Sequence, residues 1–420
     1  MSVDLTNPPE ASSRPSFGRA LRSRPFFLLW LSQLISQSGD FVFEVALLWL
    51  VLEVTGSVFA VGLVVAVTLL PSVVLGPFLG VLVDRWDRRR MLIVTNVAEG
   101  LVVAALSGLL LTHTVDLTLI LVVVFFLGTG SQVVRTASTA VIPQLVERED
   151  LPPANSLMSF SNSFNQIIGL SIGGVVVGLL GVTIPIEYDA LSFFLAAVIV
   201  GAIAAAYGRP KDAVAGAPTR FSEEFAEGIR FIRENRFLLE LILLGAALNF
   251  FGNAIGALFA PYTKLVLHGG PATYGFLGAA IAFGAIVGAL VIGKIDTRTT
   301  AGKYLFGGGA AAGVLIALMG LTSMVPVAFA LVLLLGVALS ITNIPMSVLI
   351  QAKVPGRLLG RVLAAFGSLI TIAGPAGAFF AGAFASATSV STVYLLSGGV
   401  FLGVLGLGFV VMRDLRTVSY

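Results

Sequence analysis

Four polar side chains share one face of the first long apolar run, and two of them can carry a proton. They are Gln33, Gln37, Asp40 and Glu44, and their spacing of four, three and four residues aligns them along one helix face. Carboxylates one turn apart and partly removed from water repel each other, which favours protonation of one of them. Two negative charges so close together also form a favourable site for a cation. We expect Asp40 or Glu44 to exchange a proton for a cationic substrate; alternatively, Asp40 is a hydrogen-bonded structural residue at a helix contact.

Two further charges interrupt apolar runs. Glu99 lies eight residues after Met91, where its run starts, and Arg135 lies eight residues before Pro143. At about 1.5 Å per residue, both side chains are about 12 Å deep, where an ionised group costs roughly 3 kcal/mol or more. We expect Glu99 and Arg135 to form an ion pair that lowers this cost. Alternatively, Arg135 pairs with Asp40 and switches when Asp40 takes a proton.

Amides recur inside other apolar runs. We expect them to line a central cavity together with Gln33 and Gln37, although hydrogen bonding between helices is the usual role of such residues in a membrane. These amides are Asn165, Asn249, Asn253 and Asn343.

The elements that position these residues follow from the composition. The chain of 420 residues is 57% hydrophobic and only 11% charged, whereas soluble proteins carry about 25% charged residues. A bilayer is therefore the main solvent, and the long continuous apolar runs indicate helices rather than a barrel. The sequence predicts an all-α membrane protein with twelve transmembrane helices, at 26–52, 58–83, 91–112, 117–142, 154–180, 186–207, 238–261, 273–293, 304–323, 326–350, 359–386 and 391–412.

Lysine and arginine test this helix count. If the chain starts in the cytoplasm, every basic residue except Lys264 and Arg135 falls in the tails, in inner loops or at their edges. Such a bias is typical of cytoplasmic segments. We therefore expect a multi-pass protein of the cell inner (cytoplasmic) membrane with both termini cytoplasmic.

The chain divides into two halves around a polar insert. We expect a tail (1–25), a six-helix bundle (26–207), a cytoplasmic linker (208–237), a second six-helix bundle (238–412) and a short tail (413–420). Residues 221–235 of the linker have apolar positions at helical spacing, which indicates an amphipathic helix on the membrane surface or a solvated linker helix. A weak repeat at an offset of 208 relates Gly169 to Gly377 and Gly174 to Gly382. Duplicated halves are typical of transporters, with the substrate site between them.

A dense charge cluster, Asp84 to Arg90, follows the second predicted helix. Inner-loop topology explains its arginines but not the glycine four residues before Asp84. The pattern of Gly80, Asp84, Arg85, Arg88 and Arg89 resembles the loop between helices 2 and 3 of the major facilitator superfamily, although Asp87 stands where the family usually has glycine. The resemblance implies a gating latch that joins the two halves on the inner face.

A second block, Ala140-Val-Ile-Pro-Gln-Leu-Val146 followed by Ala154-Asn-Ser-Leu157, resembles the start of helix 5 in twelve-helix drug/proton antiporters of the macrolide-efflux and enterobactin-exporter branch. This implies the two-bundle major facilitator fold and proton-coupled export of hydrophobic, amphipathic or cationic compounds. Export of a siderophore or lipid, nutrient symport, and a non-transporting sensor on the same scaffold are the alternatives.

The sequence lacks the residues that several kinds of chemistry require. There is no cysteine and there are only two histidines, which leaves neither thiolates nor a histidine-based metal centre. No nucleotide motif or catalytic triad appears. We expect no enzyme activity, no cofactor, no metal and no nucleic-acid partner; the expected partners are a small-molecule substrate, protons and the lipid bilayer, for a monomer.

Overall fold

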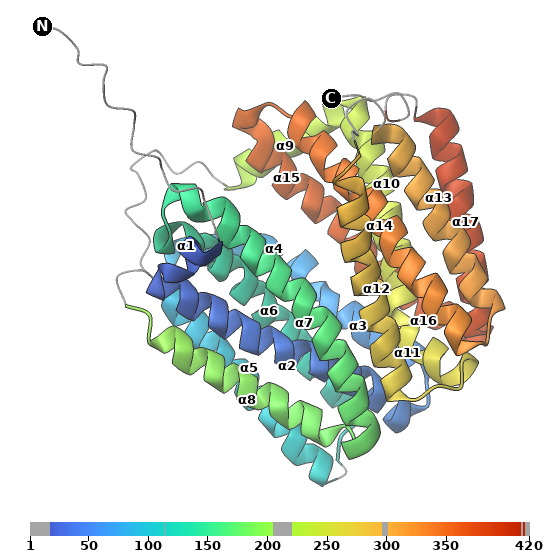
Figure 1. Cartoon of the computed structure of the whole chain (residues 1–420), viewed down its shortest axis with the longest axis horizontal. Coiled ribbons are helices and arrows are strands. Elements are labelled where there is room, and N and C mark those ends of the chain that lie inside the picture. Colours follow the sequence, from blue (N-terminus) through green and yellow to red (C-terminus); the bar gives the residue numbers. More distant parts are fainter. Residues whose placement is uncertain (1–16, 113, 205–220, 296–300, 413–414, 416–420) are drawn as a thin grey trace, which may run out of the picture.

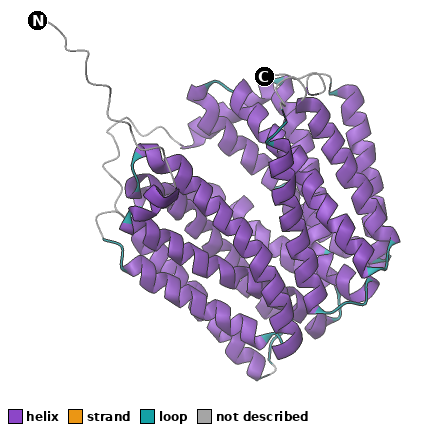
Figure 2. Cartoon of the chain, viewed as in Figure 1, coloured by secondary structure: helices purple, strands orange, loops and turns teal. Residues whose placement is uncertain are grey.

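The structure, a computed structural model, describes residues 17–112, 114–204, 221–295, 301–412 and 415. Regular secondary structure in this part of the chain is entirely helical (Figure 2). The first half contains α1 (Phe17–Arg22), α2 (Arg24–Thr55), α3 (Val58–Val74), α4 (Gly76–Arg85), α5 (Arg88–Leu111), α6 (Leu117–Leu145), α7 (Leu151–Leu180) and α8 (Thr183–Gly201). The second contains α9 (Phe221–Glu234), α10 (Arg236–Ala257), α11 (Phe259–Pro261), α12 (Pro271–Ile292), α13 (Ala301–Leu321), α14 (Val325–Lys353), α15 (Gly356–Thr371), α16 (Ala373–Ala387) and α17 (Val390–Val411).

The predicted fold class is confirmed. Within the described residues, eleven helical segments are long and apolar enough to cross a membrane, with α15 and α16 counted as one, and the shorter α3 continues into α4 as a further crossing. The helices gather into two bundles (Figure 1). An even number of crossings returns the chain to its starting side. We call the side where α2 begins and α17 ends the tail side, and the opposite side the far side.

Three predicted helices are interrupted. The span at 58–83 divides at Leu75, between Pro71 and Pro77, because proline lacks the N–H of a helical hydrogen bond and clashes with the preceding turn. The span at 359–386 divides at Ile372, between α15 and α16. The span at 238–261 becomes α10 and α11 and then continues in a π-helical turn, Tyr262–Val266. The predicted bundle boundaries remain predictions. Residues 1–16, 413–414 and 416–420 of the predicted tails, 205–207 at the end of the predicted first bundle and 208–220 of the predicted linker lie outside the described residues.

Two short helices dock on the tail side. In α9, Glu227 forms an ion pair with Arg361 of α15, and a Cβ on Gly228 would lie 2.6 Å from the Arg361 carbonyl oxygen. In α1, Arg19 contacts three acidic side chains between α6 and α7, including Asp150 at 2.8 Å. The amphipathic helix predicted in the linker is therefore present, and it packs against the protein's own α15.

Glycines bring the two bundles together near the far side. A Cβ on Gly275 of α12 would lie 3.0 Å from the Cα of Gly174 in α7, and a Cβ on Gly382 of α16 would lie 2.9 Å from the Cα of Gly62 in α3. Side chains here would force the backbones apart. Gly174 and Gly382 are related by the 208-residue repeat, so each half contributes an equivalent glycine to this seam.

The repeat is also visible inside each bundle. A Cβ on Gly169 would lie 2.7 Å from the Cβ of Phe41 in α2, and one on Gly377 would lie 2.1 Å from the carbonyl oxygen of Phe250 in α10. In both halves a glycine of this pair lets its helix press against the first helix of its own bundle.

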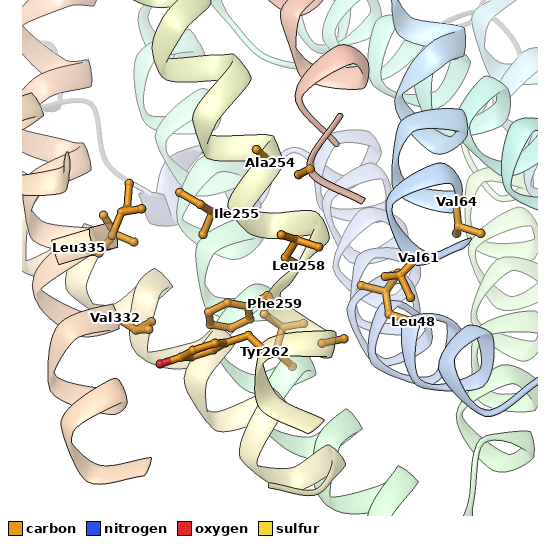
Figure 3. Packing of buried hydrophobic residues seen from close by; sticks show 14 of the residues in the cluster. Leu48, Val61, Val64, Ala254, Ile255, Leu258, Phe259, Tyr262, Val332 and Leu335 are labelled. Carbon is orange, nitrogen blue, oxygen red and sulfur yellow. The ribbon is translucent and has the colours of Figure 1, made fainter. Parts of the chain in front are cut away.

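Apolar packing continues across the far-side seam. One cluster includes Leu48 and Val61 of the first half together with Leu258 and Tyr262 of the second (Figure 3). The ammonium of Lys264 lies 5.1 Å from the centre of the Trp49 ring, which adds a cation–π contact between the halves. Toward the tail side the bundles diverge (Figure 1).

Gly174→Val should loosen the far-side seam, because overpacking costs about 1–3 kcal/mol and an added Cβ already meets a carbonyl oxygen at 2.6 Å. Spin labels at Val54→Cys and Ala387→Cys would report the far-side distance, and the chain has no cysteine that would need removal. We expect longer distances in the variant. Gly178→Val, one turn away and with open space around it, is the matched control; identical distance distributions for both variants would contradict the seam.

Candidate functional site

Glu44 of α2 projects into two cavities that residues of both halves line. Its side chain is exposed, whereas its neighbours Phe43 and Val45 are buried. The larger cavity, about 430 Å³, lies between α2, α3, α6 and α8 of the first half and α10 of the second. The smaller, about 210 Å³, extends into the second half. Glu44 therefore lies where the two halves face each other across the cavities.

The smaller cavity is largely apolar and rich in aromatic rings. Phe251, Phe259, Tyr274 and Phe401 line it, and Gln166 provides an amide. Aromatic faces attract cations, and a carboxylate at the edge of such a cavity adds a full negative charge. The arrangement suits an apolar compound that carries one positive group.

Asp40 joins the larger cavity to a third one of about 330 Å³, which residues of the first half line. This third cavity is polar: Gln33, Gln37 and Arg135 face it, together with several serines and asparagines. The predicted face of α2 therefore does line cavities along its whole length. Neither Asp40 nor Glu44 has a hydrogen-bond or ion-pair partner among the described residues.

The prediction that Glu99 and Arg135 form an ion pair is wrong. Both residues line the polar cavity, but Arg135 is exposed there and donates a hydrogen bond to Gln132 on its own helix. Glu99 is 1% exposed, its carboxylate oxygens have no hydrogen-bond partner in the described structure, and a Cβ on Gly130 would lie 2.3 Å from one of them. The arginine's long side chain finds a partner one turn away instead of reaching the buried carboxylate, and no ion pair to Asp40 forms either.

The amides divide between packing and cavity roles. Asn165 is buried and donates to the Leu34 carbonyl at 2.8 Å, which ties α7 to α2. Asn253 lines the larger cavity and donates to Asn249, one turn before it. Asn343 is exposed on α14 and lines none of these three cavities. Gln37 accepts from Asn162 at 3.2 Å across the polar cavity.

Sequence reasoning missed Asp189. This residue of α8 is fully buried, lines the larger cavity beside Asp40, and has one carboxylate oxygen without a partner in the described structure. The signal available in the sequence was an acidic residue three positions inside the span predicted at 186–207, which is nearer to the end of its span than Glu99, eight positions inside the span predicted at 91–112.

Three residues of the motif at the junction of α4 and α5, Gly80, Arg85 and Arg89, can be placed from their described surroundings. Gly80 has no atom within 4 Å of the position its Cβ would take. Arg85 is exposed, and Arg89 donates to the carbonyl of Gly201 at the end of α8. The side chain of Asp84 lies outside the described part of the chain, and Arg88 begins α5. The close approach expected of Gly80 is therefore absent in this conformation, because the bundles diverge on the tail side.

Asp87, which departs from the usual motif, has a local role. Its carboxylate accepts from the backbone N–H of Arg90 at 3.0 Å and so caps the start of α5. An N-terminal cap of this kind stabilises a helix by about 1 kcal/mol. Where the family usually has a flexible glycine, this chain has an aspartate that fixes the first residue of α5.

Two relatives align with most of the length of this chain. Macrolide efflux protein A of Streptococcus pyogenes is 25% identical over 390 residues, which cover 90% of this chain and 93% of that protein. The multidrug efflux pump Tap of Mycobacterium bovis is 26% identical over 392 residues, covering 88% and 89%.

Solved structures share the fold. A bacterial homologue of the human lysosomal transporter Spinster, in an inward-facing and unoccupied conformation, aligns with a TM-score of 0.74 at 14% identity, covering 94% of this chain and 97% of that one. The nucleoside transporter NupG aligns with a TM-score of 0.68 at 13% identity, covering 94% and 99%. A family described as transmembrane secretion effectors matches residues 17–417. With its two helical bundles and central cavities, the chain belongs to this family of the major facilitator superfamily and is a membrane transporter, not an enzyme.

Proposed function

We propose that this transporter exports lipophilic compounds, above all monovalent cations, in exchange for protons. The observation that carries the proposal is Glu44: an exposed carboxylate, without a partner among the described residues, in cavities that both halves line. A carboxylate held in apolar surroundings strongly favours either a proton or a cation. Competition between the two at one place is what exchange requires.

The cavities suggest a division of labour. The positive group of the substrate lies near Glu44, and its apolar body lies among Phe251, Phe259 and Phe401. Asp40, which faces both the larger cavity and the polar one, holds the proton. Arrival of the cation releases that proton, and rocking of the bundles carries the substrate across. The names of the macrolide and multidrug efflux relatives support export of drug-like compounds.

The distribution of charge supports an orientation. With the tail side in the cytoplasm of a bacterial-type inner membrane, Lys264 is the one basic residue of an outer loop. The far-side seam is then the closed outer gate, and the diverging tail side is open to the cytoplasm. Gly80, which has free space around it here, would meet the second half when the protein opens outward.

Glu44→Gln should weaken binding of tetraphenylphosphonium, a lipophilic monovalent cation, about tenfold or more. Loss of a charged partner costs about 1.5–3 kcal/mol, and 1.4 kcal/mol corresponds to tenfold in affinity. Fluorescence titration of the purified protein measures the effect, and binding of the uncharged dye N-phenyl-1-naphthylamine should change little. Glu53→Gln, an exposed acid of the same helix outside these cavities, is the control. Equal losses for the charged and uncharged probes would refute the role of Glu44.

Asp40→Asn should abolish transport driven by a pH gradient but preserve binding. Proteoliposomes with an imposed pH gradient and no membrane potential would show this with tetraphenylphosphonium. In the wild type, affinity for this cation should rise with pH, because a deprotonated Asp40 attracts it; in the variant this rise should be smaller. Gradient-driven uptake at the wild-type rate in Asp40→Asn would show that the proton is carried elsewhere.

Asp84→Asn should slow transport several-fold without changing substrate affinity, because the latch is proposed to act only in the outward-open state. The matched variant Asp87→Asn keeps a good capping residue and should transport normally. The two rates are compared in the same proteoliposome assay. A fall in affinity as large as the fall in rate would contradict a gating role.

A further inference from the structure

Asp189 is buried with neither a cation nor a helix N-terminus as its partner. Its side chain is 0% exposed and packs against Gly39 of α2; a Cβ added to Gly39 would lie 2.5 Å from the Asp189 Oδ1. Its Oδ2 has no hydrogen-bond partner in the described structure. The hydroxyl of Ser192 donates to the Asp189 main-chain carbonyl at 2.8 Å and is 3.5 Å from Oδ1. A carboxylate kept only for structure would cap a helix or pair with a cation, and Asp189 does neither.

The groups that face Asp189 are acidic. Asp40 of α2 lines the larger cavity together with Asp189 and the polar cavity together with Glu99 of α5, so its carboxyl lies between the other two. On α8 itself, Glu187 is bonded to Ser107 at 3.3 Å and Tyr188 to Ser38 at 2.8 Å. Among the described residues that line the three cavities, the one basic side chain is Arg135 of α6, which faces the polar cavity and is hydrogen-bonded to Gln132. Three carboxylates in one bundle without a cation between them cannot all be ionised at low cost.

The larger cavity gives Asp189 a route to Asp40. Both residues line it, as does Glu44, and a cavity of about 430 Å³ holds several water molecules. Glu99, by contrast, lines the polar cavity and not this one. Of the two fully buried acids, Asp189 is therefore the one that can exchange a proton with Asp40 and respond to a cation at Glu44.

We propose that Asp189 is a second proton-carrying residue, which releases a proton in addition to that of Asp40 when a cationic substrate binds. The proposal rests on the proton exchange proposed above. In the empty cavity Asp189 holds its proton as a carboxylic acid. When Asp40 loses its proton and the cation arrives, the O–H bond of Asp189 breaks, and its proton passes to cavity water and leaves toward the side that is open.

The test counts protons released on substrate binding. Purified protein in a weakly buffered detergent solution with a pH-indicator dye is mixed with saturating tetraphenylphosphonium. We expect Asp189→Asn to release about one proton fewer per bound cation than the wild type, with its binding capacity retained. Glu187→Gln, an acid on the same helix two residues away, removes a carboxyl that lines none of the cavities and should release as many protons as the wild type.

The outcomes separate the two proposals. If the wild type releases no proton, proton exchange itself fails; if it does and Asp189→Asn releases the same number, only the role of Asp189 is overturned. Should Asp189→Asn not fold, infrared difference spectra give the answer in folded proteins. The protonated-carboxyl band that disappears when tetraphenylphosphonium binds should shift in frequency in Asp189→Glu, and an unshifted band would overturn the proposal.

Discussion

The structure depends on one electrostatic constraint: four carboxyl groups of the first bundle line its cavities, and none of them forms an ion pair with a described residue. Asp40 and Glu44 relieve the constraint because they are partly or fully open to these cavities, whereas Glu99 and Asp189 lie at the cavity walls but are buried. Enclosure requires space, and Gly130 and Gly39 provide it where any side chain would strike the carboxylate. Such an arrangement is costly for stability, and the proton exchange proposed above would give these groups a use.

The second half contributes shape more than charge. Its part of the cavity walls is uncharged and mostly apolar, with Tyr274 and Asn253 as its polar side chains, and its buried Glu240 is hydrogen-bonded to Arg236 and to the backbone of Leu415 outside these cavities. The two bundles share a packing plan, as the equivalent positions of Gly174 and Gly382 show, but they have diverged in chemistry. The first half supplies the acidic groups of the cavities, and the second supplies the apolar surface against which the proposed substrate would lie.

The sequence was sufficient for the helices, their order, the polar face of α2 and the small residues of α7, because these follow from hydrophobic length and from periodicity within one helix. It was not sufficient where helices meet. The pairing of Glu99 with Arg135 assumed that equal depth brings side chains together, but depth does not give the rotation of a helix or the reach of an arginine toward Gln132. Asp189 was missed for the same reason: its closeness to Asp40 exists only after α8 packs on α2 against Gly39. The break at Leu75 lies between two prolines that membrane helices often tolerate.

The contact between Lys264 and Trp49 has a practical consequence. The chain has three tryptophans; Trp30 donates to Ser161 within its own half, and Trp86 is exposed at the end of α4. Trp49 is the one whose ring lies beneath an ammonium group from the opposite bundle. A separation of the bundles at the far side would remove that charge from the indole and change its emission, so Trp49 would report such an opening without an attached dye.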